Sequence, residues 1–254
     1  MPRALNMLRT APHYRRECFE HGLRACGFKD VPAVYRPEVG DVLLIWNRYG
    51  AGEEMARHFE ANGARVLVAE NCPLGNELHG GSYSLAGGHV ALVGGLIVDG
   101  GTQRWDTWGI EPSAWKRSRQ TLILGQRGIG GTETRSPAHW AEHTRERIGG
   151  RIRVHPGTGP AVPLADDLAG VGRVVTWASA AAIQALLHGV SVWHEHPRFV
   201  GAAASRPLSQ WPGEDKADDA ARLEVFRRMA WAIWTLEEIR NGEAIAHALS
   251  KRSV

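Results

Sequence analysis

Hydrophobic positions along the chain fall into short continuous runs that alternate with stretches of helical spacing. The runs typical of buried strands are 3–8, 41–46, 65–69, 121–125, 151–155, 173–177 and 190–194. The stretches that place apolar residues on one helical face are 13–26, 53–62, 137–148, 164–169 and 180–188. Strands that alternate with helices in this way predict right-handed βαβ units and parallel sheets.

Two segments break the alternation. Residues 75–117 are rich in glycine and lack helical periodicity, which indicates either tight turns between short strands or a loop whose backbone approaches a ligand closely. A new apolar run starts at Thr121, so we expect a domain junction at 112–120. Near the end, Leu223, Phe226, Ala230 and Ile233 recur at helical spacing and predict one long helix over 218–248.

The pattern as a whole predicts an α/β protein with two Rossmann-like domains that face a cleft. Residues 1–117 are expected to form the first domain and 118–217 the second. The segment 218–254 is expected to be a C-terminal helix that packs across the junction.

Composition narrows the class of protein only slightly. The 254 residues carry 30 Lys and Arg against 27 Asp and Glu, a net charge of +3 that permits an anionic partner without requiring one. Three cysteines cannot form a disulfide framework, and the first residues do not resemble a signal peptide. No run of 18 apolar residues exists, so we expect no membrane contact and a cytoplasmic location, in the host cytoplasm if the protein is viral. Ten tryptophans are more than usual and suggest stacking as well as core packing.

The most informative segment is 173–194, in which a strand leads through small residues into a helix. Open parallel sheets bind ligands at the carboxyl ends of their strands, and a helix N-terminus attracts anions. Ser179, in the turn, can either cap the helix or donate to a phosphoryl oxygen.

This segment resembles the nucleotide-sugar domain of GT-B glycosyltransferases, particularly the capsule-polysaccharide type. The residues that carry the resemblance are Val174–Thr176, Ser179, Ala185–Leu187, Gly189 and Val190–Val192, the pair His155–Pro156, and TLILGQRG at 121–128. Trp177-Ala178 and Ala180 depart from the family pattern around the serine, and Arg153 stands in for a lysine before the His-Pro pair.

The resemblance implies a nucleotide-sugar co-substrate, with a UDP-sugar expected first, and no tightly bound cofactor. The residues that it assigns to the donor are Gln126, Arg127, His155, Thr176, Ser179 and Glu195. The metal-dependent alternative fold normally carries Asp-x-Asp, which this sequence lacks, so we expect a metal-independent reaction. His194 and His196 have the spacing of metal ligands but no third ligand is indicated.

The acceptor side is less defined. A general base is expected from the first domain, with Glu70, His89 and Asp99 as catalytic candidates. The residues expected to bind the acceptor are Trp105, Trp108, Lys116 and Arg117. Tryptophan stacks on sugars or bases and a basic cluster suits a phosphate backbone.

These acceptor residues favour a hydroxymethylated pyrimidine in double-stranded DNA, as in a phage genome, because phage DNA-modifying glycosyltransferases share the GT-B scaffold. Other functions remain open from the sequence. One is a glycosyltransferase that acts on a surface glycan, and another is a non-catalytic nucleic-acid-binding protein. A further one is an epimerase or phosphotransferase with the same two-domain scaffold, because a fold does not fix a function.

Overall fold

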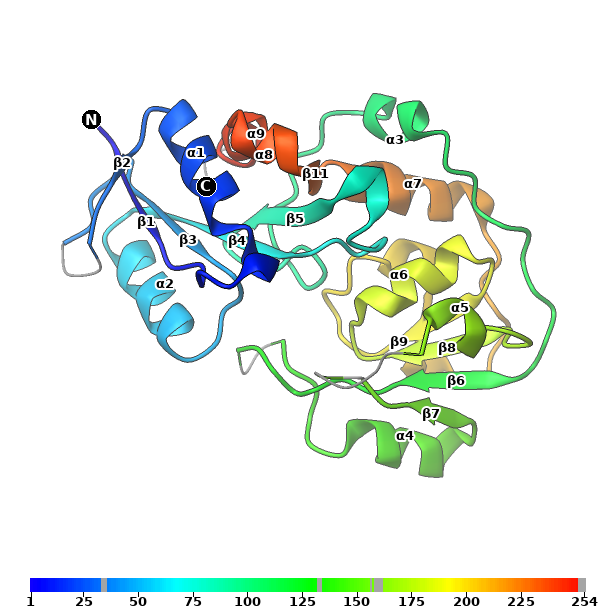
Figure 1. Cartoon of the computed structure of the whole chain (residues 1–254). Helices are drawn as coiled ribbons and strands as arrows, with labels where there is room; N and C mark the ends of the chain where they lie inside the picture. Colours follow the sequence, from blue (N-terminus) through cyan, green and yellow to red (C-terminus); the bar gives the residue numbers. More distant parts are fainter. Residues whose placement is uncertain (33–35, 132–133, 156, 158–161, 251–254) are drawn as a thin grey trace. The chain divides into compact units, whose positions relative to one another are not determined.

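The computed structural model is an α/β structure and describes residues 1–32, 36–131, 134–155, 157 and 162–250 (Figure 1). Its strands are β1 (Arg3–Asn6), β2 (Lys29–Asp30), β3 (Val42–Ile45), β4 (Arg65–Asn71), β5 (Ser82–Gly87), β6 (Thr121–Leu124), β7 (Arg151–Arg153), β8 (Arg173–Thr176), β9 (Ser191–His194), β10 (Arg206–Pro207) and β11 (Ile233–Thr235). Its α-helices are α1 (Arg16–Ala25), α2 (Ala51–Ala61), α3 (Gln103–Trp108), α4 (Trp140–Ile148), α5 (Leu164–Asp167), α6 (Ala180–Leu187), α7 (Asp219–Ala230), α8 (Leu236–Arg240) and α9 (Glu243–Ala248). Short 3-10 turns lie at Pro12–Tyr14, Leu78–Gly80, Ala202–Ala204 and Leu208–Gln210.

The chain divides into two compact units, which are described separately. Unit 1 consists of Met1–Gly101 and the segment from Arg228 onward, and unit 2 is Thr102–Arg227. The division differs from the expected boundaries at 117 and 217, because residues 102–117 and 218–227 belong to unit 2 and the chain returns to unit 1 at Arg228.

Unit 1 contains a mixed six-stranded sheet with the order β11-β5-β4-β3-β1-β2. Strands β2, β1, β3 and β4 run parallel, as the alternation of strands and helices predicts. β5 pairs antiparallel to β4, and β11 pairs antiparallel to β5. The glycine-rich stretch therefore provides a central strand of the sheet, which corrects the expectation of a purely parallel arrangement.

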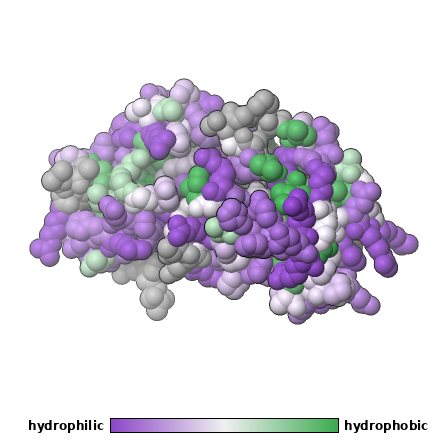
Figure 2. Space-filling view, turned by 90° about the horizontal axis from the view of Figure 1, so that it is seen from below, coloured by the Kyte–Doolittle hydropathy of each residue, from purple (hydrophilic) through white to green (hydrophobic). Residues whose placement is uncertain are grey.

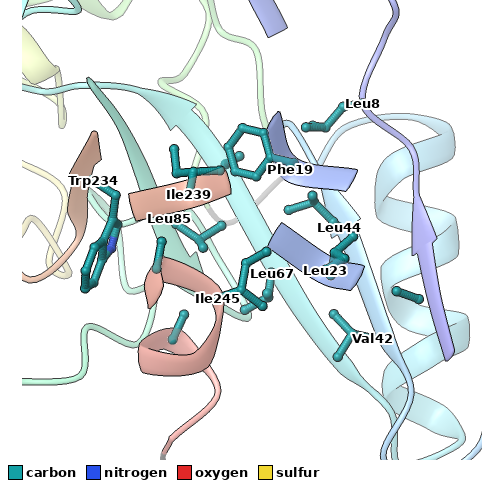
Figure 3. Close-up of a cluster of buried hydrophobic side chains, with 14 of the residues drawn as sticks. Leu8, Phe19, Leu23, Val42, Leu44, Leu67, Leu85, Trp234, Ile239 and Ile245 are labelled. Atoms are coloured by element: carbon teal, nitrogen blue, oxygen red, sulfur yellow. The ribbon is translucent and has the colours of Figure 1, made fainter. Parts of the chain in front are cut away.

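Helices cover both faces of this sheet. On one face, Phe19 and Leu23 of α1 and Ile245 of α9 pack against strand residues such as Leu44 and Leu67 (Figure 3). On the other face, Ala56 and Phe59 of α2 pack against a second buried cluster. Side chains alternate between the two faces along a strand, so a strand buried on both sides reads as a continuous apolar run.

Unit 2 contains a five-stranded, entirely parallel sheet with the order β10-β9-β8-β6-β7. α4 and α6 lie on opposite faces of it (Figure 1). Trp140 and Ala141 of α4 pack against Ile123, Val175 and Trp193 of the strands. Because every strand runs in the same direction, all the carboxyl ends meet at one edge of the sheet.

The predicted C-terminal helix over 218–248 is wrong. α7 ends at Ala230, β11 follows as an edge strand of unit 1, and α8 and α9 complete the segment. Thr235 begins α8 through a capping box, in which its hydroxyl accepts from the Glu238 N–H while the Glu238 carboxylate accepts from the Thr235 N–H. The T-x-x-E signature of this cap is present in the sequence, but the apolar spacing across it favoured one continuous helix.

Hydrophilic residues cover most of the face shown in Figure 2, and hydrophobic residues lie there in small groups. Within the described part of the chain, no helix is both long enough and apolar enough to span a membrane.

Candidate functional site

The carboxyl edge of the unit 2 sheet gathers all six residues that the sequence assigns to the donor. Gln126 and Arg127 follow β6, and His155 follows β7. Thr176 ends β8, Ser179 precedes α6, and Glu195 follows β9. Pro156, which belongs to the His-Pro element, lies outside the described residues. The register of the strands explains this gathering, since Leu124 is level with both Arg153 and Thr176.

The turn between β8 and α6 is held by side chains. The Gln126 side-chain Oε1, from the loop after β6, accepts the Ala178 N–H at 2.9 Å, and the Thr176 hydroxyl oxygen accepts the Ser179 N–H at 2.8 Å. Ser179 is the N-cap of α6, and its Oγ accepts the Ala181 N–H at 3.3 Å. Thr176 is fully buried, and its hydroxyl positions the turn. These backbone N–H groups are therefore occupied, where the sequence suggested that they would meet a phosphate.

Arg127 and His155 form the part of the edge that can bind an anion. Both line a pocket of about 230 Å³, together with Gln126, His139 and Trp140. Partial desolvation, followed by the charges of Arg127 and Arg153, lowers the pKa of His155 below its usual value. The His155 Nδ1 accepts the Gly157 N–H at 3.0 Å, which leaves Nε2 to carry the ring proton.

Arg153 is committed elsewhere. Its guanidinium pairs with the Asp167 carboxylate and donates to the Val162 carbonyl oxygen at 2.9 Å. The residue that stands in for the family's lysine is therefore a structural tie between β7 and the α5 region, and Arg127 is the cation of the pocket.

Glu195 is fixed by α4. The Trp140 Nε1–H donates to its Oε2 at 2.6 Å, and the Arg147 guanidinium lies 4.0 Å from the same oxygen. Trp140 and His139 were not among the residues predicted for the site. His139 has a left-handed backbone, with φ of 55°, at the start of α4. No local signal marks either residue, because only the packing of α4 under the sheet brings them to the pocket.

The three candidate bases do not lie together in unit 1. Glu70 is at the carboxyl end of β4, and burial raises the pKa of its carboxyl group to about 8. His89 follows β5, which is antiparallel, and the neighbouring Gly88 N–H donates to Val66 at the start of β4. His89 is thus near the amino edge of the sheet, about 15 Å along the strand direction from Glu70.

Asp99 is exposed, and its carboxylate accepts the Gly101 N–H at 2.8 Å. It lies three residues after Leu96, which pairs with Gly87 at the end of β5. Glu70 is the candidate base that the strand bounds place at the carboxyl edge of the sheet.

Comparison with solved structures identifies proteins of similar fold. The chain is similar in fold to KpsC. The β-Kdo 2,7 transferase of Thermosulfurimonas dismutans KpsC aligns over 99% of this chain and 100% of its own, with a TM-score of 0.53 and 11% identity. The β-Kdo 2,4 transferase of the same KpsC aligns over 91% and 90%, with a TM-score of 0.51 and 14% identity. At this level of identity the likeness to KpsC shows the fold alone.

Comparisons by sequence give nothing further. No family model matches the chain, and no curated protein matches it by sequence.

Three of the four residues predicted to bind an acceptor have partners of their own in unit 2. Trp105 is buried and stacks on Phe226 at 4.8 Å, so it is a core residue of unit 2. Trp108 is half-buried beneath the Arg104 guanidinium. The Lys116 ammonium donates to the Leu168 carbonyl oxygen at 3.0 Å, and Arg117 is exposed. All four lie in unit 2 and not in the first domain, because the segment 102–117 packs there.

A metal centre has no support in the described part of the chain, where no group of three or more His, Cys, Asp or Glu side chains could hold an ion. His194 and His196 are both buried. The His194 Nδ1 lies 2.7 Å from the Ser205 hydroxyl, and the His196 Nδ1 accepts the Arg198 N–H at 3.1 Å. Each histidine therefore has a structural partner of its own.

Proposed function

We propose that this chain is a glycosyltransferase that moves a sugar from a nucleotide-activated donor to a hydroxyl group of a glycan. The observation that carries the proposal is the carboxyl edge of the unit 2 sheet, where Arg127 and His155 line one pocket with Gln126, whose side chain binds the β8–α6 turn. The likeness in fold to KpsC, whose two structures are described as Kdo transferases, supports the same reaction class.

The donor half of the proposed reaction needs positive charge. When the bond between the anomeric carbon and the phosphate oxygen breaks, the leaving nucleotide gains negative charge, which the Arg127 guanidinium offsets. His155, protonated on both ring nitrogens when an anion binds, adds a second charge and a hydrogen bond from Nε2. The proposal includes a reaction that proceeds without a metal ion, and its rate should therefore be the same with and without EDTA.

The acceptor half needs a base. In the proposed reaction the acceptor oxygen bonds to the anomeric carbon, and its proton passes to a carboxylate, for which Glu70 is the candidate in unit 1. With a pKa of about 8, Glu70 is mostly protonated at neutral pH. We therefore expect the rate to rise with pH up to about pH 8 and then to level, and Glu70→Gln to abolish turnover at every pH.

A glycan acceptor replaces the DNA acceptor that the sequence favoured. That reading depended on Trp105, Trp108, Lys116 and Arg117 acting together on the acceptor side. Trp105 is buried and Lys116 is engaged with a carbonyl oxygen, so two of the four are not available to a base or a phosphate. The surface-glycan alternative agrees better with the KpsC neighbours.

The test is a transfer assay with a panel of nucleoside mono- and diphosphate sugars. One arm offers acidic and neutral oligosaccharides, and the other offers DNA that contains hydroxymethylcytosine, with mass spectrometry of the products. We expect transfer to an oligosaccharide, and its loss in both Arg127→Ala and His155→Ala. Arg145→Ala removes an exposed arginine of α4 in the same unit and serves as the control. Transfer to DNA alone, or no donor turnover at all, would contradict the proposal.

A further inference from the structure

A cluster of aromatic side chains lies at the carboxyl edge of the unit 1 sheet. Trp46 follows β3, and its ring meets Tyr14 at 4.8 Å, His13 at 5.3 Å and Tyr83 at 6.1 Å between centroids, all edge to face. The Tyr83 hydroxyl donates to the His13 carbonyl oxygen at 3.0 Å and fixes the loop between β1 and α1 on this edge. We call Trp46, Tyr14 and His13 the ring platform.

The platform is only partly covered, and the described residues form no hydrogen bond with its polar side-chain atoms. His13 is exposed, while Tyr14 and Trp46 are half-buried. Among the described residues, no hydrogen bond engages the Trp46 indole N–H, the Tyr14 hydroxyl or the His13 ring. Tryptophan in the rest of the chain often uses its indole N–H as a tie, as Trp115 does to Asp219 at 2.8 Å. Rings with an apolar face and an unused polar end are suited to a ligand that has both kinds of surface.

A buried amide lies beneath the same loop. Asn6 ends β1 and is only 4% exposed. Its Oδ1 accepts the Leu8 N–H at 3.0 Å, whereas its Nδ2 has no hydrogen-bond partner among the described residues. Asn6 is level with Leu44 in the register of β1 and β3, so its side chain is on the same face as Trp46, two residues further along. An unpaired buried donor is costly, and a ligand oxygen that reaches it relieves that cost.

Two arginines belong to the loop that carries His13 and Tyr14. The Arg9 guanidinium lies over the Tyr14 ring at 5.9 Å, and both Arg9 and Arg15 are exposed. Arg15 makes no side-chain hydrogen bond or ion pair within the described residues. It also has a left-handed backbone, with φ of 48°, at the point where the loop enters α1. Such a conformation is strained for a side chain with a Cβ, and glycine would adopt it without cost.

We propose that the ring platform, Asn6, Arg9 and Arg15 form a subsite for an acidic saccharide, which places the sugar acid of a glycan acceptor at the edge where Glu70 lies. The rings pack against the C–H face of a pyranose, and the Asn6 amide and the Trp46 indole donate to its hydroxyl oxygens. The guanidinium groups bind the carboxylate. The set is rich in donors, which favours a ligand whose oxygens accept. This subsite deepens the proposed function and rests on it.

The test measures binding of trigalacturonate to the whole chain by calorimetry and saturation-transfer NMR, with maltotriose as the neutral counterpart. We expect trigalacturonate to bind and maltotriose to bind about tenfold more weakly, because it lacks the carboxylates. Arg15→Gly and Arg9→Ala should each weaken trigalacturonate binding about tenfold and leave maltotriose unchanged. Trp46→Phe should weaken both.

Arg15→Gly makes the test independent of folding. Glycine relieves the left-handed strain, so the variant should melt no lower than the parent while it binds the acid more weakly. Arg240→Gln, which removes an exposed arginine from α8 of the same unit, is the matched control and should change nothing. Equal affinity for the two trisaccharides, an unchanged Arg15→Gly variant, or a DNA oligonucleotide that binds more tightly than trigalacturonate would overturn the subsite.

The subsite and the proposed function can fail separately. If the donor is turned over in an Arg127-dependent manner but Arg15→Gly binds trigalacturonate normally, the subsite is wrong and the transferase stands. If trigalacturonate binding depends on Arg15 but no donor is bound or turned over, the transferase is wrong and the chain is a glycan-binding protein.

Discussion

At the scale of single residues, Glu70 is the side chain whose environment departs most clearly from that of a solvated group. Its pKa is about 8 against an ordinary value of 4.5, and burial is the cause. The folded state therefore keeps a proton that the unfolded chain releases, so that the free energy of unfolding contributed by Glu70 falls as pH rises from 4.5 to about 8. Below pH 4.5 the Glu70 carboxyl group is protonated in both the folded and the unfolded state, and its contribution to the free energy of unfolding is then fully present.

Glu70→Gln removes this dependence. We expect the variant to be as stable as the parent at about pH 4 and more stable by about 2–4 kcal/mol at about pH 9, because glutamine never ionises. Urea unfolding at the two pH values measures the difference. A stability gap that is the same at both pH values would show that the carboxyl group titrates normally.

His155 gives a prediction of the opposite kind, for binding. Its pKa is lowered in the free protein by partial desolvation and by Arg127 and Arg153. A bound nucleotide diphosphate raises that pKa, so a proton is taken up on binding and affinity increases as pH falls between the bound and the free pKa. Calorimetry with a nucleoside diphosphate sugar, whose own phosphates do not titrate in this range, measures the proton uptake.

We expect the affinity to fall about tenfold between about pH 5 and pH 8, and His155→Gln to abolish the dependence. Parent and variant with the same pH profile would remove His155 from the donor site.

At the scale of elements, side chains decide where helices begin. Ser179 starts α6, and Thr235 with Glu238 starts α8. The indole N–H groups have a related use, since Trp177 donates to the Thr134 carbonyl oxygen and Trp231 donates to that of Gly101. The surplus of tryptophan that suggested stacking on a ligand therefore serves largely to tie loops to the cores of the two units.

The capping box of α8 is directly testable. Thr235→Ala removes the hydroxyl that accepts from the Glu238 N–H at 3.2 Å, and we expect a loss of about 1 kcal/mol in the free energy of unfolding. Thr235→Ser, which keeps the hydroxyl, should restore most of it. Chemical denaturation followed by circular dichroism compares the two variants. A Thr235→Ala variant as stable as the parent would mean that packing on the sheet alone sets the start of α8.

At the scale of the whole molecule, the two units should respond to ligands separately. A nucleotide sugar that binds at the carboxyl edge of unit 2 stabilises that unit by mass action, about 2.7 kcal/mol at a hundredfold excess over Kd. Hydrogen exchange should therefore slow in β6, β8 and α6, while exchange in β1 and β3 of unit 1 stays unchanged. Slower hydrogen exchange in unit 1 alone would show that the donor does not bind in unit 2.

The sequence by itself determined most of the local elements and the residues at the carboxyl edge of the unit 2 sheet. The apolar runs and helical spacings predicted most of the strands and helices, because burial on one or two faces leaves a short-range pattern. The donor residues could be predicted to converge, because all the strands of unit 2 are parallel and parallel strands end at one edge. In the structure Arg127 and His155 line one pocket, and their binding to a donor stays a prediction.

Only the tertiary structure decided strand direction and the partners of distant segments. β5 runs antiparallel to β4, which moves His89 to the edge opposite Glu70. β11 adds a strand to unit 1 where helical spacing predicted a continuous helix, and Trp105 is buried against Phe226 instead of facing an acceptor. These outcomes depend on contacts between residues far apart in the chain, whose free energy local periodicity does not encode.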